Sequence, residues 1–285
     1  MEASGTGRQE LTWPGGRAPP GAGLWARMSL RPVPLAELFV RGERAFREVP
    51  LYPRLKACLV DDGVLFLVAG EGSQPTSLDR ATFLNLTFWH AGVQADVLVD
   101  ASIEADVVTH AAWHHAASRA LGTGLPPTAA ALFLGESVAS AFDVYVLGRM
   151  LRTGRQTAYL KSQMPLMAAA AADSGCDDDG VQAMFQSMAE SPEAAFRDLR
   201  ELLFDASLEL FGCVAIEEAA DCLVGFESHR FGSILHHFAL SSWVLYARAH
   251  AGAPVAADPA MVVDRALRAA PVALDWLETN WLGPG

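Results

Sequence analysis

The feature that most constrains this chain is a pair of histidines on an alanine-rich segment. His110 and His114 are four residues apart in a run with helical spacing that follows Ser102. On an α-helix, side chains four residues apart lie about 6 Å apart along the axis and project from one face. Glu136 follows on a second helical segment, after a turn rich in Gly and Pro. The pattern predicts two antiparallel helices that bring two imidazoles and one carboxylate together.

This set of donors is typical of a zinc site. Imidazole nitrogens bind zinc at about 2.0 to 2.1 Å, and three protein ligands leave a fourth position for water. His115 is rotated by about 100° from its neighbour around the helix, so we expect it to point away from the ion. The sequence therefore predicts His110, His114 and Glu136 as metal ligands, with zinc as the cofactor.

The residues around these ligands resemble the zinc-binding core of gluzincin metallopeptidases, especially the thermolysin-like group. In that family an Asn-x-Phe-Trp-type edge strand precedes an Asp-Val-Val-x-His-Glu-x-x-His helix, and a later helix supplies a glutamate. The similar stretches in this chain are Asn85–Trp89, Asp106–His114 and Gly135–Glu136. The resemblance implies a gluzincin-like fold and a zinc-dependent hydrolase site.

Two positions depart from the family pattern. The residue after the first histidine is a glutamate that acts as general base in the family, and here it is Ala111. An alanine cannot accept a proton from metal-bound water, and positioned acid–base groups contribute about 10² to 10⁴ in rate. Four residues after Glu136, where the family often has an Asp that orients a ligand histidine, this chain has Ser140. Asp143 lies two turns beyond Glu136 and either takes over that role or faces solvent.

A later segment around His229 is similar to the part of the family that carries an oxyanion-stabilising histidine at a helix start. The resemblance implies this catalytic role for His229. Because the usual base is missing, His115 and Glu227 are the remaining candidates for a proton acceptor near the metal. We interpret His236 and His237, which follow on the same expected helix, as part of a polar helix face.

Charge and composition disfavour several functional classes. The chain has 285 residues, a formal net charge of −12 and 51% hydrophobic residues. Nucleic acids and anionic membranes attract clustered Lys and Arg, so this acidic chain is expected to bind a neutral or basic peptide or small molecule instead. It has no uncharged apolar run of 18 residues and no signal-like start, which predicts neither a membrane span nor secretion. Its four cysteines form no CxxC pair, which predicts reduced thiols and a cytoplasmic location.

The expected fold class is α+β, with a small β-containing part before a mostly helical part. Residues 1–30 are rich in Gly, Pro, Ala and Arg without apolar periodicity, so we expect a disordered tail. Residues 31–100 contain the strand signals. Residues 101–285 form the helical, metal-binding part.

The local patterns predict individual elements. In the first part they predict a helix over 34–48, a hairpin of strands 55–60 and 64–69 around an Asp-Asp-Gly turn, and strands over 82–89 and 95–99. In the second part Ser102 is expected to cap the first helix, and further helices are expected over 128–151, 159–172, 191–211, 227–250 and 259–281. Residues 173–180 are interpreted as an acidic surface loop.

The leading interpretation is a zinc-binding protein with a degenerate gluzincin-like fold. Peptidase or other hydrolase activity by the usual route is not expected, because Ala111 replaces the general base. The alternative is a non-catalytic binding or scaffold protein that keeps only the metallopeptidase-like fold. A helical di-iron oxidase ranks last, because its site needs Glu-x-x-His pairs and the sequence has none.

Overall fold

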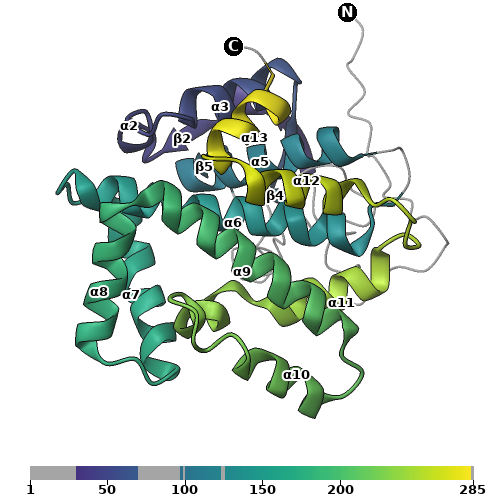
Figure 1. The fold of residues 1–285 in the computed structure, drawn as a ribbon. Coiled ribbons are helices and arrows are strands. Elements are labelled where there is room, and N and C mark those ends of the chain that lie inside the picture. The colour runs from purple at the N-terminus through teal and green to yellow at the C-terminus, as the bar shows by residue number, and fades with distance from the viewer. Residues whose placement is uncertain (1–29, 70–96, 99, 123–125, 284–285) are drawn as a thin grey trace, which may run out of the picture. The chain divides into compact units, whose positions relative to one another are not determined.

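The computed structural model describes residues 30–69, 97–98, 100–122 and 126–283 (Figure 1). The predicted tail, apart from Leu30, and the expected strand over 82–89 lie outside the described residues. The chain divides into two compact units. The first comprises the described residues within Met1–Arg41 and Leu59–Ile103, and the second those within Gly42–Cys58 and Glu104–Gly285.

The first unit contains two small sheets. β3 (Leu65–Ala69) lies between β1 (Leu30–Pro34), to which it is antiparallel, and β4 (Val97–Leu98), to which it is parallel. β2 (Phe39–Arg41) pairs with β5 (Ser102–Glu104). With a mostly helical remainder, these short sheets make the protein α+β, as the sequence predicts.

The predicted hairpin is correct only in its second strand. Residues 55–60 belong to the helix α3 (Tyr52–Asp61), in which Leu55 and Leu59 are fully buried one turn apart. Gly63 adopts a φ of 63°, and the backbone N–H of Val64 then donates to the carbonyl of Leu59. The left-handed glycine therefore follows the end of a helix instead of turning a hairpin. A short apolar run fits a buried strand and a buried helix equally well, which explains the error.

The helix predicted over 34–48 is also wrong. This stretch contains the 3-10 turn η1 (Leu35–Glu37), the strand β2 and the one-turn helix α2 (Glu43–Phe46). Leu38 is extended and Gly42 has a φ of 71°, so neither residue continues a helix. The apolar spacing there reflects three short elements that each bury one or two side chains.

The second unit is helical. Besides α2 and the part of α3 up to Cys58, its elements are α5 (Ala105–Leu121), α6 (Ala129–Arg152), α7 (Ala158–Asp173), α8 (Asp178–Glu190), α9 (Pro192–Gly212), α10 (Ile216–Val224), η2 (Gly232–Phe238), α11 (Leu240–His250), α12 (Pro259–Ala269) and α13 (Ala273–Trp281). α6 is the central helix and packs against α5, α8, α9 and α12, while α7 and α8 run side by side (Figure 1). Among the described helices, α6 alone is long and apolar enough to cross a membrane, but 78% of its apolar window is buried inside the protein. It is the core helix of this unit.

Small residues let α5 and α6 approach each other. Ala112, Ala116 and Ala117 on α5 are buried, and Gly135 on α6 lies next to Ala117. α6 begins after Thr128, whose side-chain oxygen accepts a hydrogen bond from the backbone N–H of Ala131. Gly135 also lies next to the ring of His114, so the close approach places His114 beside the turn of α6 that carries Glu136.

Several helix boundaries differ from those predicted. α6, α7 and α9 match their predicted ranges within two residues, but the first helix begins after Glu104, so the predicted Ser102 cap is wrong. The expected helix over 227–250 is broken into a turn, η2 and α11, because Ala239 takes a left-handed φ of 49°. The expected helix over 259–281 is interrupted between α12 and α13 at a segment that contains Pro271. α8 begins within the last three residues of the segment interpreted as an acidic loop, with Asp177 as its N-cap.

Candidate metal centre

The three predicted ligands converge between α5 and α6. His110 and His114 lie one turn apart on α5, and their ring centroids are 5.2 Å apart. Glu136 projects from α6, where it is only 6% exposed. The three side chains offer ligand atoms that all lie within 4.8 Å of one another, which is close enough to hold a metal ion. The structure therefore brings these three side chains together, as the sequence predicts.

The separation of two of these donors fits a tetrahedral metal site. The Nε2 atom of His114 lies 3.5 Å from Oε2 of Glu136. Two donors bound tetrahedrally at about 2.0 to 2.1 Å from one zinc ion are about 3.3 Å apart. The observed distance is long for a hydrogen bond between these atoms and close to this ligand-to-ligand spacing.

Asp143 holds the other histidine. Its Oδ2 atom lies 2.8 Å from Nδ1 of His110, and its second oxygen, Oδ1, is buried and has no hydrogen-bond partner among the described residues. The hydroxyl of Tyr159 on α7 donates to the backbone carbonyl of Asp143 at 2.8 Å, which ties this part of α6 to α7. Of the two roles considered for Asp143, the structure supports the contact with a ligand histidine. Ser140, at the family's usual position, is buried and makes no such contact among the described residues.

The two imidazoles have opposite pKa shifts. Burial alone would lower the pKa of His110, but the charge of Asp143, the hydrogen bond to it and the charges of Glu136 and Asp106 raise it above its ordinary value. At His114, burial outweighs the opposing effect of Glu136, and the pKa is lowered. His114 is thus favoured as a neutral imidazole, the form that binds metals.

A third carboxylate belongs to the same cluster. Asp106 lies one turn before His110 on α5, and burial, together with the charge of Asp143, raises its pKa to about 6. The main charges that act on His110, His114 and Asp106 come from carboxylates, with no lysine or arginine among them. The cluster therefore concentrates carboxylates around His110, whose charge also acts on His114, in a place where Glu136 is buried and Asp106 and Asp143 are half-buried.

The candidate proton acceptors are not brought to the ligands. Ala111 is buried at the position of the family's general base. His115 is half-buried and lies outside the group of three ligands, while Glu227 is exposed in the turn after α10. The structure places neither residue in a position that supports the role of general base.

His229 is placed beside α9, away from the group of three ligands. Its Nδ1 atom accepts a hydrogen bond from the backbone N–H of Phe231 at 3.1 Å. Burial lowers its pKa, and the acidic charges that oppose this effect belong to Asp198 and Glu201 on α9. Its oxyanion role stays a prediction, and none of the contacts described for it supports that role.

The charge of Asp143 also acts on a different histidine. His237, in η2, is half-buried, and burial lowers its pKa against the opposing charge of Asp143. The sequence interpretation placed it on a polar helix face, since a continuous helix was expected there. The only sequence signal for its position is the His-His pair itself, because the left-handed Ala239 that ends η2 has no glycine or asparagine to reveal it.

Comparison of the chain with protein-family models, with curated proteins and with solved structures finds no match. The motif around Asn85–Trp89 lies outside the described residues. The resemblance to gluzincins thus rests on the two histidines, the glutamate and the order of the elements that carry them.

Proposed function

We propose that this protein binds one zinc ion through His110, His114 and Glu136, at a site of the gluzincin type between α5 and α6. The observation that carries the proposal is the convergence of these three donors within 4.8 Å. Two imidazoles and one carboxylate are a known ligand set of catalytic zinc sites. Water or a ligand group takes the fourth position.

The charge of the cluster supports a bound cation. Asp106, Glu136 and Asp143 bring three carboxylates to a half-buried to buried region, where His110 is the cationic group among the main charge effects and no lysine or arginine takes part. Burying like charges without compensation is costly. A divalent cation offsets two of these negative charges, and the histidine nitrogens beside the carboxylates serve as its ligands.

The residues of the chain have distinct tasks in this proposal. His110, His114 and Glu136 hold the ion, and Asp143 fixes the orientation of His110 through Nδ1. When bound, zinc supplies a Lewis acid that polarises a ligand oxygen or lowers the pKa of a bound water. The acidic overall charge favours a neutral or basic peptide or small molecule as the ligand, in a cytoplasmic protein.

Catalysis by the usual peptidase route is not part of this proposal. Ala111 offers no carboxylate, and the structure brings neither His115 nor Glu227 into the group of ligands. A non-catalytic binding or scaffold role is the second candidate, and the observation that favours it is the buried alanine at the base position. The two candidates share the metal site and differ in turnover.

Zinc-dependent thermal unfolding, combined with a peptidase assay, tests the proposal. Zinc at about 100 times its Kd stabilises the folded state by about 2.7 kcal/mol, so it is expected to raise the Tm of the wild type and of Ala111→Glu but not of Glu136→Gln. Ala111→Glu restores the family's base. Peptide hydrolysis that appears only in this zinc-loaded variant would show an otherwise intact hydrolase site.

The remaining outcomes are equally informative. A zinc-stabilised Ala111→Glu variant that hydrolyses no peptide favours the binding or scaffold role. An equal rise in Tm for the wild type and Glu136→Gln contradicts the proposed ligand set.

A further inference from the structure

Two thiols meet at Glu209, at the junction of α9 and α10. Cys213 directly follows α9, and its Sγ lies 3.3 Å from the carbonyl oxygen of Glu209, to which it donates. Cys222, on α10, directs its Sγ to Oε2 of the same glutamate at 3.6 Å. Both cysteines are half-buried and free.

The backbone between the thiols is already ordered. The N–H groups of Val214 and Ala215 donate to Oε2 of Glu218, at 2.8 and 3.3 Å. Arg248 on α11 donates to the carbonyl of Cys213. A crosslink between two groups that are already held near each other loses little further chain entropy on closing.

We propose that Cys213 and Cys222 are a site of reversible covalent modification, at which a low-molecular-weight disulfide such as oxidised glutathione converts them to an intramolecular disulfide. One thiolate attacks the small disulfide, forms a mixed disulfide with the protein and releases one glutathione thiolate. The second cysteine then attacks the protein-bound sulfur and expels the other glutathione. The two protein thiols lose two electrons and two protons in total, and oxidised glutathione is reduced to two molecules of thiol.

The environment of Cys222 sets the order of the two attacks. Burial raises the pKa of Cys222 to about 12, with further contributions from Glu209 and Cys213. A thiol that stays protonated is a poor nucleophile, so Cys213 attacks first and Cys222 resolves the mixed disulfide. Glu209 thus slows the closing step and keeps the pair reduced under mild conditions.

The disulfide crosslinks α10, a helix with no buried residue, to the end of α9. No residue of α10 is buried, and Val214, Ile216 and Val224 are 92%, 85% and 59% exposed. A bond from Cys222 to the end of α9 ties this helix covalently to the helical core. The expected consequence is slower local opening of α10, measurable as slower amide hydrogen exchange in the oxidised protein.

Peptide mapping of the full chain tests the proposal directly. The chain has no Lys or Arg between Arg200 and Arg230, so both cysteines fall in the tryptic peptide 201–230, whereas Cys58 and Cys176 fall in others. After treatment with oxidised glutathione, this peptide is expected to lose two hydrogen atoms and to resist alkylation. Further cleavage after Glu217 or Glu218 is expected to leave two fragments joined by a disulfide.

Matched variants distinguish a built pair from incidental oxidation. Cys222→Ser is expected to stop at a glutathione adduct on Cys213, and Cys213→Ser is expected to leave the poorly nucleophilic Cys222 largely unmodified. Cys176→Ser, which alters a half-buried cysteine in another part of the helical unit, is expected to form the crosslink like the wild type. Glu209→Gln removes a charge that adds to the effect of burial on the pKa of Cys222, so the disulfide of this variant is expected to form faster than that of the wild type. Glutathione adducts without a crosslink in the wild type, or a crosslink that involves Cys58 or Cys176, would overturn the proposal.

Discussion

Asp143 determines which nitrogen His110 presents to its neighbours. Its Oδ2 atom accepts a hydrogen bond from Nδ1 of His110 at 2.8 Å, which places the ring proton on Nδ1 and leaves Nε2 as the donor to a metal. The family resemblance places the corresponding group four residues after Glu136, where this chain has Ser140. The helix repeat allows the exchange, since the fourth and the seventh residue after Glu136 lie on the same face of α6.

Replacing Asp143 by Asn is expected to weaken zinc binding by about 10- to 100-fold, because the asparagine cannot hold the imidazole with a charged acceptor. The measurement is competition for zinc against a chromogenic chelator. Ser140→Ala is the matched control on the same helix face and is expected to bind zinc like the wild type. Equal affinities for Asp143→Asn and the wild type would remove Asp143 from the site.

Asp106 makes the stability of the metal-free protein depend on pH. Burial and the charge of Asp143 raise its pKa from an ordinary value of 3.8 to about 6 in the folded chain, so the folded state binds more protons than the unfolded state between these values. Stability therefore falls as pH rises through this window. The shift corresponds to about 3 kcal/mol at about 1.4 kcal/mol per pKa unit.

Asp106→Asn is expected to remove this part of the pH dependence. In the presence of a chelator, the difference in free energy of unfolding between Asp106→Asn and the wild type is expected to shift in favour of the variant by up to about 3 kcal/mol as the pH rises from about 4 to about 7. Urea unfolding at both pH values measures the change. Asp275→Asn, which alters another aspartate in the first turn of a helix, controls for the interaction with the helix dipole. A wild-type pH profile in Asp106→Asn would show that Asp106 is ionised normally.

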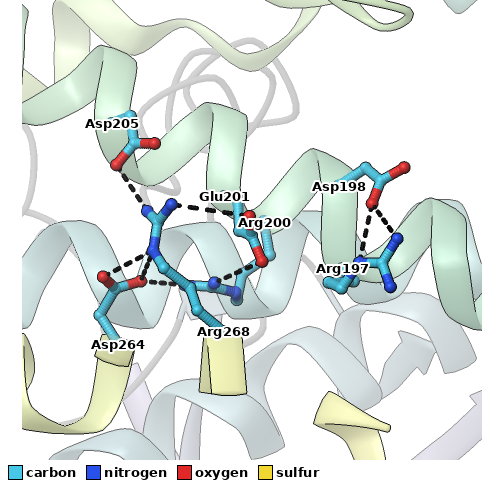
Figure 2. Close-up of polar contacts among 7 residues, drawn as sticks. All are labelled: Arg197, Asp198, Arg200, Glu201, Asp205, Asp264 and Arg268. Carbon is cyan, nitrogen blue, oxygen red and sulfur yellow. Dashed lines mark hydrogen bonds and ion pairs between the residues drawn. The ribbon is translucent and has the colours of Figure 1, made fainter. Parts of the chain in front are cut away.

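At the scale of elements, a buried ion pair joins α9 to α12. Arg200 on α9 is fully buried, and its Nη1 atom lies 2.5 Å from Oδ1 of Asp264 on α12, whose side chain is 6% exposed (Figure 2). Arg268 also binds Asp264, at 2.9 Å, and reaches Asp205 on α9. The neighbouring pair of Arg197 and Asp198 is much more exposed, so one helix carries a buried and an exposed ion pair.

Asp264→Ala is expected to destabilise the protein by about 3 to 5 kcal/mol, because it leaves the buried guanidinium of Arg200 with only the longer, 3.4 Å contact to the part-exposed Glu201. Arg197→Ala, on the more exposed pair, is expected to cost about 0 to 1 kcal/mol. Chemical denaturation of the two variants measures the difference. Similar losses in both would mean that the α9–α12 contact does not depend on this buried charge.

The predictability of the elements follows how long and how regular they are. α6, α7 and α9 were predicted nearly to their ends, since each repeats its apolar spacing over several turns. α3 was mistaken for a strand because ten residues with two buried leucines do not separate a period of 3.6 from a short apolar run. η2 was missed because only the tertiary structure forces Ala239 into a left-handed conformation.

The residues of the candidate site also differ in how well the sequence predicts them. His110, His114 and Glu136 were predictable because a helical repeat and one short turn fix their spacing. Asp143 was predictable as one of two alternatives. The effect of Asp143 on His237 was not predictable, since the position of His237 depends on the break after η2 and on contacts between η2 and α7, which are distant in the sequence.

At the scale of the whole molecule, one of the two compact units contains every proposed ligand. His110 and His114 on α5 and Glu136 on α6 all belong to the unit formed by Gly42–Cys58 and Glu104–Gly285. The buried core of this unit surrounds α6, and the site lies along the α5–α6 contact. The metal is therefore expected to stabilise the helical unit as a whole, because its ligands join two helices of that core.

The zinc content of the purified full chain, measured by elemental mass spectrometry, tests the central claim most directly. About one zinc per chain is expected in the wild type after reconstitution, and almost none in His114→Ala or Glu136→Gln. His229→Ala, whose histidine lies beside α9, is expected to retain the metal. A wild-type protein that holds no zinc, or a zinc content that both ligand variants leave unchanged, would contradict the account.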